Sequence, residues 1–535
     1  MKLFSSIKKL VRSPFGLGLA VLLLAILAYG IHIPWMGFYW DDWPWVWFSH
    51  VKGPAGMRLI DIEHRPVTGW VLYLGTLLSG EQPLGWQIYN LAFRVLGCFS
   101  LAWMLKALWP GEKERIDWVV LLFLVYPGFG QQFVAVNNSR HLFPLATFFL
   151  SLGLMIQAQR YPARSRALTA ASLAFSLLTM LTTEYYYGLE WIRLLLLWLI
   201  TPRQVAGLRD RFLTVLKAWL PYLLPLALIF GWRYTVSKTA NYQITLFESF
   251  SAAPGQGLVT FLQAALRDLA EAGLGVWAKL FHFPDPVTYG SRARLNFWGL
   301  VILAAAGALV YFGSQSPRAT RKKWALEAIL LGAALLIIAP IPFWVTGLDI
   351  KANFPFDRLT LPMMIGSSLL LVGLLEFSLR WKLVRWVVLS ALIGLAVGTH
   401  YQNGVTYRRD WSHQTTFFQH LVWRIPGLQA DTALLANELP TTYSTDNSLT
   451  APLNWTYNPG FSEGNLTAYL FYVDLRFGDK DRALSPGTLT THDYRFYPFS
   501  GSPQQALVIY NQPPGCTRVL SAGLHQHFPG LPANL

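Results

Sequence analysis

The sequence FGLGLAVLLLAILAYGIHI, at residues 15–33, decides the class of fold. This run is close to the length of about 20 residues that an α-helix needs to cross the hydrocarbon core of a bilayer. It carries no Lys, Arg, Asp or Glu, and comparable runs recur from residue 83 to residue 399. The sequence therefore predicts an all-α polytopic membrane protein with roughly eleven transmembrane helices.

Composition supports this prediction. Hydrophobic residues make up 53% of the chain, charged residues 13%, and the mean hydropathy is +0.35. Soluble domains carry about 25% charged residues, so a soluble fold is disfavoured. The net charge of +15 comes from cations that lie mostly between apolar runs. This placement indicates contact with anionic membrane lipids rather than with nucleic acid. The two cysteines, Cys98 and Cys516, form neither a disulfide framework nor a metal motif.

The expected spans and their orientation follow from apolar length and from the distribution of Lys and Arg. A cleaved signal peptide is the alternative for the first run, but the run is long and no small-residue cleavage pattern follows it. Lys and Arg are concentrated in alternate connections, which places the N-terminus in the cytoplasm and, with an odd number of spans, the tail outside the plasma membrane. The spans are expected at residues 15–33, 83–108, 117–130, 142–158, 167–183, 185–200, 213–231, 296–313, 324–346, 359–377 and 384–399.

Two domains are expected. Residues 1–400 form the transmembrane domain, with large outer loops at residues 34–82 and 232–295. Each loop contains an apolar or amphipathic stretch, at residues 66–79 and 256–283, that is too short or too polar for a span and fits a helix in the membrane interface. The tail, residues 401–535, is richer in polar and turn residues and has short β-like runs at residues 433–436 and 506–510. We expect it to be a small extracytoplasmic α/β domain.

The strongest candidate for chemistry is the acidic pair in Tyr39-Trp40-Asp41-Asp42-Trp43, directly after the first span. Paired acids among aromatic residues at a membrane face are costly unless they have a role. A carboxylate held among apolar rings acquires the raised pKa that suits a general base. The alternative is that one aspartate caps an interfacial helix while the aromatic rings form a headgroup belt.

Four further polar segments are expected at the same face. Arg65 could hold a phosphate or contact a lipid headgroup. Glu184, at a tight turn between two spans, needs a partner, and an outer arginine is the simplest one. Arg358 could pair with its neighbour Asp357 or stabilise a departing phosphate, whereas Glu190 and Arg193 are spaced as a structural pair. The segments are Glu63-His64-Arg65-Pro66, Asn137-Asn138-Ser139-Arg140-His141, Thr182-Thr183-Glu184-Tyr185 and Phe356-Asp357-Arg358-Leu359-Thr360-Leu361-Pro362.

The order of these motifs resembles the GT-C superfamily of membrane glycosyltransferases, which use polyprenyl-phosphate sugars, and its protein O-mannosyltransferase-like branch in particular. The middle motif of that branch often reads Ser-Lys-Glu; residues 182–184 here read Thr-Thr-Glu, so the lysine is absent. The late motif often reads Glu-Arg-Tyr-x-Tyr-x-Pro; residues 357–362 read Asp-Arg-Leu-Thr-Leu-Pro and keep an acid, the arginine and a proline. The resemblance covers about residues 1–430 and includes Arg408-Arg409-Asp410-Trp411 and Leu421-Val422-Trp423.

The resemblance implies a GT-C fold and an inverting transfer of sugar from a polyprenyl phosphate to an acceptor hydroxyl at the outer face. Asp42, preferred slightly over Asp41, is then the expected general base. Arg358, supported by Arg65, is expected to bind the lipid phosphate. The sugar and acceptor site is expected to be shaped by Glu184, His64, Asn138, Arg140 and His141.

Partners and alternatives stay open at this level. No cofactor is expected; the two aspartates could bind a divalent ion, but adjacent acids alone are poor evidence for a metal. The sugar is undetermined, and the acceptor could be a protein, a lipid or a glycan. A transporter or flippase of lipid-linked saccharides would need similar residues, but no inverted repeat with paired broken helices is visible. A simple membrane anchor for the tail leaves Asp41, Asp42 and Glu184 without a role.

Overall fold

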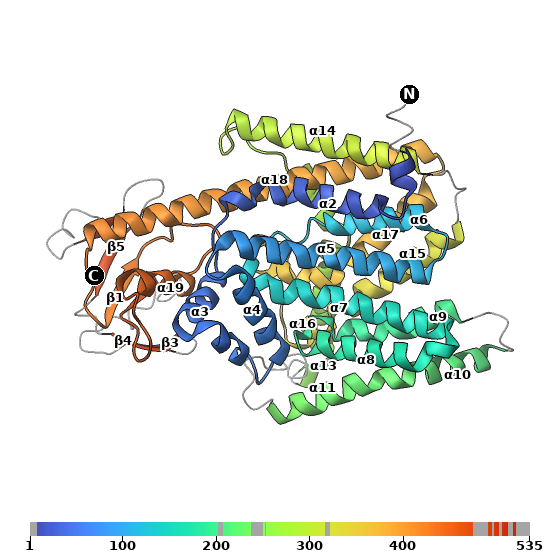
Figure 1. Cartoon of the computed structure of the whole chain (residues 1–535), viewed down its shortest axis with the longest axis horizontal. Helices are drawn as coiled ribbons and strands as arrows, with labels where there is room; N and C mark the ends of the chain where they lie inside the picture. Colours follow the sequence, from blue (N-terminus) through green and yellow to red (C-terminus); the bar gives the residue numbers. More distant parts are fainter. Residues whose placement is uncertain are drawn as a thin grey trace.

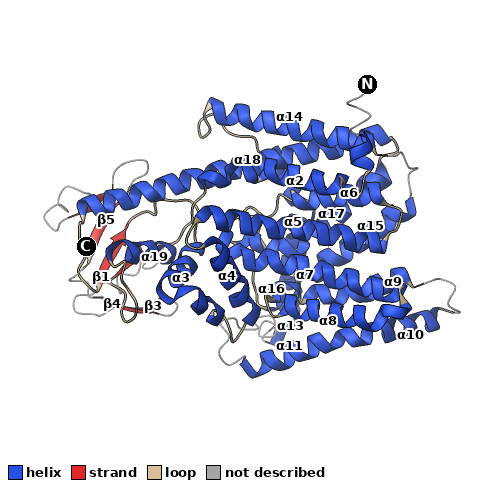
Figure 2. Ribbon diagram, viewed as in Figure 1, coloured by secondary structure: helices blue, strands red, loops and turns tan. Residues whose placement is uncertain are grey.

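A computed structural model describes residues 8–201, 207–236, 250–251, 253–315, 322–473, 490–494, 497–501, 506–511 and 517–520. Within these residues the chain forms a bundle of helices that carries a small domain with strands at one end (Figures 1 and 2). The expected all-α polytopic architecture with a small C-terminal α/β domain is confirmed. Cys516 and residues 237–249 of the second outer loop lie outside the described residues.

Eight helical segments among these residues are long and apolar enough to cross a membrane. Their mean hydropathy over 18 residues is 1.5 or higher, as the hydrocarbon core of a membrane requires of a helix that crosses it. They are α2 with η1 (Gly16–Trp35), α5 (Pro83–Leu108), α7 (Ala135–Arg160), α10 to α11 (Leu208–Val236), α14 (Ser291–Ser314), α15 with α16 (Lys322–Val345), η9 with α17 (Phe356–Ser378) and α18 (Lys382–Arg424).

Contacts between distant segments define the two ends of the bundle. At the N-terminal end, Lys113 Nζ lies 3.4–3.5 Å from backbone oxygens of residues 11–13, and Arg12 Nε donates to Ser314 O. At the tail end, the ring of Tyr29 packs 4.8 Å from that of His400. Three shorter segments join the eight long ones between these ends: α6 (Lys113–Leu124), α8 (Ser165–Met180) and η5 with α9 (Gly188–Ile200). The expected spans at residues 117–130, 167–183 and 185–200 correspond to these three shorter helices, so the described residues give eight helices of spanning length where eleven spans were expected.

The connections at the tail end contain the helices expected there. The first large loop forms α3 (Asp42–Gly56), η2 (Met57–Leu59) and α4 (Pro66–Ser79), the last with the bounds that the sequence predicts. In the second loop, the amphipathic stretch forms α13 (Pro254–Gly273), and the chain then continues as the 3₁₀ helix η8 (Gly275–Phe281). The other connections at the tail end contain two short 3₁₀ segments, η4 (Glu184–Tyr186) and the first turns of η9.

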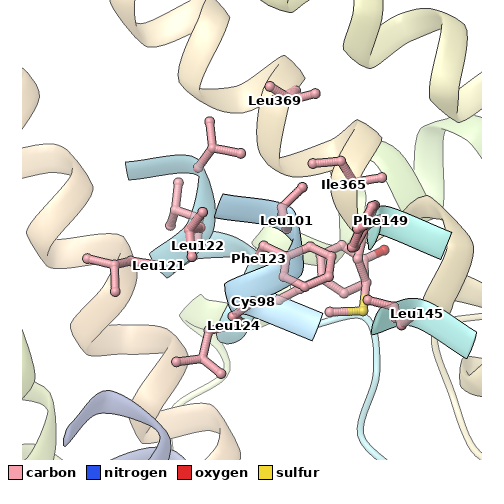
Figure 3. Packing of buried hydrophobic residues seen from close by; sticks show 14 of the residues in the cluster. Cys98, Leu101, Leu121, Leu122, Phe123, Leu124, Leu145, Phe149, Ile365 and Leu369 are labelled. Atoms are coloured by element: carbon pink, nitrogen blue, oxygen red, sulfur yellow. The ribbon is translucent and has the colours of Figure 1, made fainter. Parts of the chain in front are cut away.

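The core lies where α5, α6, α7 and α17 meet (Figure 3). Cys98 and Leu101 of α5 contact the run of apolar side chains at residues 121–124 of α6, and both are fully buried. Leu145 and Phe149 of α7 and Ile365 and Leu369 of α17 close the cluster. Elsewhere, α15 and α17 cross at paired glycines: a Cβ on Gly332 would lie 2.8 Å from Gly366 O, so only a glycine permits this approach.

The tail is an α/β domain built on the extended end of α18. This helix continues without a break through His400, where a span was expected to end, to Arg424. Strand β1 (Thr432–Ala436) pairs in parallel with β2 (Ala468–Tyr472), and α19 (Asp446–Tyr457) supplies the crossover that a parallel pair needs. The sheet has the order β2-β1-β5-β6, and the remaining strands are β3 (Thr490–Tyr494), β4 (Tyr497–Gly501), β5 (Leu507–Tyr510) and β6 (Arg518–Leu520).

Candidate functional site

The predicted site residues gather at the tail end of the bundle, each near the start of a helical element. Asp41 precedes α3, Arg65 precedes α4, residues 137–141 form the first turns of α7, Glu184 begins η4, and Arg358 lies in η9. Chain reversals at this end place charged residues just outside the apolar parts of the helices, where their charge costs least. Five segments that are far apart in the sequence thus supply one group of side chains.

Asp42 is a buried anchor in this structure. Its side chain is fully buried, and its carboxylate accepts hydrogen bonds from the backbone N–H groups of Asn137 at 2.8 Å, Ala135 at 3.0 Å and Tyr39 at 3.4 Å. Burial raises the pKa of Asp42 well above its usual range, although these N–H donors oppose the shift. The carboxylate therefore ties the start of α3 to the first turn of α7 and presents neither oxygen to an acceptor. The sequence-based preference for Asp42 over Asp41 finds no support in this geometry.

Asp41 points toward the open side of the same turn. Its side chain is 22% exposed, and Oδ2 lies 3.8 Å from Nη1 of Arg358. The guanidinium of Arg358 also lies over the ring of Trp40, 4.7 Å from its centroid, and its buried Nε has no hydrogen-bond partner among the described residues. Arg358 is thus a cation that is held in place but not saturated by its carboxylate neighbour.

The backbone at Trp40 is strained in a way that orients Asp41. Trp40 has a φ of 43°, in the left-handed region that a bulky side chain rarely adopts. Such a conformation costs on the order of 1–3 kcal/mol and persists only where the surroundings hold it. Here the Trp40 ring packs 5.0 Å from that of Phe354 and carries Arg358 on its face. The strain turns two adjacent aspartates in different directions, one into the protein and one toward Arg358.

Glu184 is paired with two arginines. Nε of Arg65 donates to Oε2 of Glu184 at 2.9 Å, Nη2 of Arg65 donates to Oε1, and Nη2 of Arg233 lies 3.4 Å from Oε2. Burial alone would raise the pKa of Glu184, but these two cations outweigh it and lower the pKa to about 2. The turn carboxylate is therefore ionised, and Arg65 is committed to it rather than to an open position. Sequence reasoning missed Arg233; its signal is a lone cation at the end of an apolar run.

The first turns of α7 contribute a second, more enclosed group. Arg140 bridges Asp61 at 3.0 Å and the side-chain oxygen of Asn137 at 2.8 Å, and it covers the ring of Trp45. The imidazole of His141 stacks on the ring of Tyr185 with centroids 4.7 Å apart.

The remaining two candidates contribute less. Asn138 is fully buried and donates to Gln131 O, so it holds the loop before α7. His64 lies beside Arg65, and its buried Nδ1 has no hydrogen-bond partner in the part of the chain that is described.

Tyr185, which the sequence did not single out, lies at the centre of these charges. Burial raises the pKa of its hydroxyl, while Arg358, Arg65 and Arg140 act to lower it and Glu184 acts to raise it. The ion pairs of this site join four arginines (Arg65, Arg140, Arg233 and Arg358) to three carboxylates (Asp41, Asp61 and Glu184), while the buried carboxyl groups of Asp42 and Asp357 lie outside these pairs. Arginines that share carboxylates at a partly open site suit an anionic group.

Two simpler expectations are settled by the contacts. Asp357 does not pair with its neighbour Arg358; its carboxylate accepts hydrogen bonds from Gly130 N at 2.7 Å and from the side chain of Gln131. Glu190 and Arg193 do form the expected structural pair, with Nε 2.7 Å from Oε2, fully buried within the bundle. Among the residues that the structure describes, no group of three His, Cys, Asp or Glu side chains is arranged to hold a metal ion.

Comparisons with known proteins give one distant likeness. No protein-family description matches the chain, and no curated protein matches it in sequence. Among solved structures it is similar to ArnT from Cupriavidus metallidurans, whose crystal structure was determined bound to undecaprenyl phosphate. The two chains have 13% sequence identity and a TM-score of 0.43, over 93% of this chain and 94% of the other.

Proposed function

We propose that this protein is a membrane glycosyltransferase that moves a sugar from a polyprenyl phosphate to an acceptor hydroxyl at the membrane face that carries the tail. One observation carries the proposal: a partly exposed carboxylate, Asp41, lies 3.8 Å from an incompletely hydrogen-bonded arginine, Arg358. A base and an anion-binding cation side by side are the two groups that such a displacement requires.

Asp41 is the general base in this proposal. It takes the proton of the acceptor hydroxyl as the acceptor oxygen forms its bond to the anomeric carbon. The bond from that carbon to the phosphate oxygen breaks, and the electron pair leaves with the polyprenyl phosphate. Attack from the face opposite the phosphate inverts the anomeric configuration. Because phosphate leaves as a stable anion, one carboxylate suffices, unlike the pair that most glycosidases need.

Arg358 is the group that meets the charge of the departing phosphate. A guanidinium matches phosphate oxygens in geometry, and a fixed cation in a partly dry site needs no reorganisation as charge develops. Trp40 holds the guanidinium by its ring face, which leaves the N–H edge available for a ligand. Arg65, Arg140 and Arg233 add positive potential, but each is held by a carboxylate, so we assign them to framing the site.

The order of motifs along the chain supports this class of enzyme. The acids after the first helix, the acid at the turn before α9 and the arginine in η9 resemble the GT-C pattern, and all three positions occur together at one end of the bundle. A transporter of lipid-linked saccharides would also need an arginine for phosphate. It would not need a carboxylate base beside that arginine.

The test is sugar transfer by the purified full chain in lipid, offered a panel of radiolabelled polyprenyl-phosphate sugars with a panel of acceptors. Asp41→Asn is expected to lower the release of polyprenyl phosphate by about 10²–10⁴-fold, the usual worth of a general base. Glu63→Gln is the matched control, since Glu63 is an exposed acid of the same loop, and it should transfer normally. Full activity in Asp41→Asn would show that Asp41 is not the general base. If the wild type binds the donor but transfers no sugar to any acceptor, the site belongs to a transporter rather than to an enzyme.

A further inference from the structure

A separate cavity with a mixed lining of rings and polar groups lies at the tail end, beside the site but not part of it. Its volume is about 400 Å³, within the range of about 300–1,000 Å³ that small-molecule sites occupy. Four regions that are distant in sequence enclose it: the loop before α7, η8, residues 352–357 and the outer half of α18. The tail adds Thr442 and Tyr443. The cavity therefore exists only where the transmembrane bundle and the tail meet.

One layer of aromatic rings separates this cavity from Asp41 and Arg358. Phe354 lines the cavity, and its ring packs 5.0 Å from that of Trp40, which in turn carries Arg358 on its face. Asp357 lines the cavity while its neighbour Arg358 contacts Asp41. A ligand in the cavity would thus lie close to the proposed base while remaining outside the arginine cluster.

The lining combines ring faces with amide and hydroxyl groups. Tyr407 and Tyr443 stack with centroids 4.2 Å apart, and Phe354 lies 5.1 Å from Tyr443. Asn353 and two threonines supply polar groups, whereas Asn403 already donates to Gly130 O and accepts from the hydroxyl of Tyr443. Rings offer a surface for the C–H faces of a sugar, and amide side chains both donate to and accept from its hydroxyls. This combination suits a polyhydroxylated ligand better than an acyl chain.

Lys279 gives the cavity its charge. Its ammonium donates to Ala352 O and lies 3.5 Å from Oδ1 of Asn353, but it forms no ion pair within the described ranges. An ammonium has three N–H donors, so a further one is available. The only acidic residue among the described lining residues is Asp357, and its two oxygens are already used by Gly130 and Gln131. These hydrogen bonds do not remove the charge of Asp357, so the described lining holds one cation and one acid, and Lys279 is the group that an anionic substituent of a ligand would contact.

We propose that this cavity binds the head of the acceptor, a saccharide that carries an anionic group held by Lys279. The inference rests on the proposed transferase function, which it deepens by naming the class of acceptor. The anionic group is a phosphate or a carboxylate, because an ammonium binds both. The partly buried ring of Tyr443 orients the saccharide, and its acceptor hydroxyl reaches Asp41 around the ring of Phe354, which separates the cavity from the base.

The tail has a defined part in this proposal. The backbone N–H of Tyr443 donates to Oδ2 of Asp410 in α18 at 2.8 Å, and its hydroxyl donates to Oδ1 of Asn403 at 3.2 Å. These two hydrogen bonds fix the tail against the long helix and complete the wall of the cavity. The tail is thus a part of the acceptor site rather than an independent module.

The experiment measures binding to the full chain in nanodiscs by saturation-transfer NMR and calorimetry. The probes are glucose 1-phosphate, glucuronic acid and methyl glucoside. At least one anionic probe should bind about tenfold more tightly than methyl glucoside, and Lys279→Met should abolish that preference. Which anionic probe binds distinguishes phosphate from carboxylate. Lys351→Met is the matched control: this exposed lysine directly precedes the cavity loop in sequence, pairs with Asp349 and should not affect binding.

Several outcomes would overturn the proposal. They are no binding of either anion at millimolar concentration, unchanged preference in Lys279→Met, or Lys279-dependent binding of geranyl phosphate, which would assign the cavity to the donor. If Lys279→Met fails to fold, Lys279→Gln removes the charge while keeping a hydrogen-bond donor and decides the matter. Asp41→Asn should bind the anionic probes as the wild type does. Binding with normal Lys279 dependence but no transfer from any donor would therefore refute the transferase and leave the cavity assignment standing.

Discussion

Two clusters of charged residues at opposite ends of the bundle differ in how completely they are paired. At the N-terminal end, Arg115 lies 2.6 Å from Glu112 and 2.7 Å from Glu376, and Arg385 lies 3.1 Å from Glu376. All four side chains are at least 94% buried. Two arginines balance two glutamates, and together they join α6, α17 and α18.

The cluster at the tail end is looser and more open. Asp41 and Arg358 are 3.8 Å apart and between a fifth and a quarter exposed, and in the ion pairs at this end four arginines share three carboxylates. Buried charges that pair with one another at 2.6–3.1 Å hold helices together and are shielded from a ligand. An incompletely paired cation that the fold keeps in place can accept one. The difference in pairing, rather than the number of charges, separates the structural cluster from the candidate site.

Removing Arg115 should give the largest change in stability. Arg115→Met leaves Glu112 without its arginine and Glu376 with only Arg385, in a fully buried position. Breaking a buried pair costs about 3–5 kcal/mol, so the unfolding temperature in detergent should fall strongly. Transfer per folded molecule should stay normal. A variant that keeps its stability but loses activity would show that the N-terminal cluster is not merely structural.

Removing Arg358 should give the opposite pattern. Arg358→Gln is expected to lower sugar transfer by about 10²–10³-fold, because the phosphate loses its fixed cation, with little change in unfolding. Arg358→Lys keeps the charge but loses the planar edge of the guanidinium. Its transfer rate should lie between those of the wild type and Arg358→Gln. Rates of release of polyprenyl phosphate measure the effect. Equal activity in the wild type and in Arg358→Gln would mean that the donor phosphate does not bind at Arg358.

The two adjacent aspartates provide the next contrast. Asp42→Asn replaces an oxygen that accepts from α7 by an NH₂ group that faces backbone N–H donors, at a cost of about 1–3 kcal/mol. Thermal unfolding should therefore drop in Asp42→Asn and remain unchanged in Asp41→Asn, while transfer shows its larger loss in Asp41→Asn. If both variants unfold alike, the two carboxylates are not in the separate environments described.

The smallest effect expected is on the pH dependence of stability. The pKa of Glu184 is lowered from 4.5 to about 2 in the folded protein, chiefly because Arg65 outweighs burial. The unfolded chain then binds a proton more readily as the pH falls, so the contribution of the pair is present above about pH 4.5 and is lost toward pH 2. Wild type should lose more stability than Glu184→Gln between about pH 5 and pH 3. Parallel curves in chemical unfolding would mean that the pair does not affect stability.

Local patterns in the sequence predicted much of the fold. The run at residues 66–79 became α4 with the same bounds, the β-like runs of the tail became β1 and β5, and the spacing of Glu190 and Arg193 gave a buried pair. Each of these depends on residues that are close together in the chain. The three short spans were less well predicted: α6 ends six residues before the expected end at residue 130, α9 begins at Ile192 rather than at residue 185, and none of α6, α8 and α9 is long enough to qualify as a span.

The candidate site was predicted less completely, for a physical reason. The sequence predicted that Asp41, Arg65, Glu184 and Arg358 lie at one end of the bundle, because the lengths of the apolar runs determine where the chain reverses direction. It did not reveal that Arg65 is used by Glu184, that Arg233 joins them, or that Lys279 lies in a cavity without an ion pair. These depend on which side chains face each other across helices separated by tens or hundreds of residues.

The sequence by itself determined that this chain is a bundle of membrane-crossing helices with polar chemistry at the ends. Runs of about 20 apolar residues leave the backbone no other way to satisfy its hydrogen bonds in lipid. Only the tertiary structure decided which aspartate is an anchor and which is a candidate base. Asp41 and Asp42 are the same residue type at consecutive positions, and what separates them is the first turn of α7, 93 residues after Asp42, whose N–H groups enclose one carboxylate and leave the other facing Arg358.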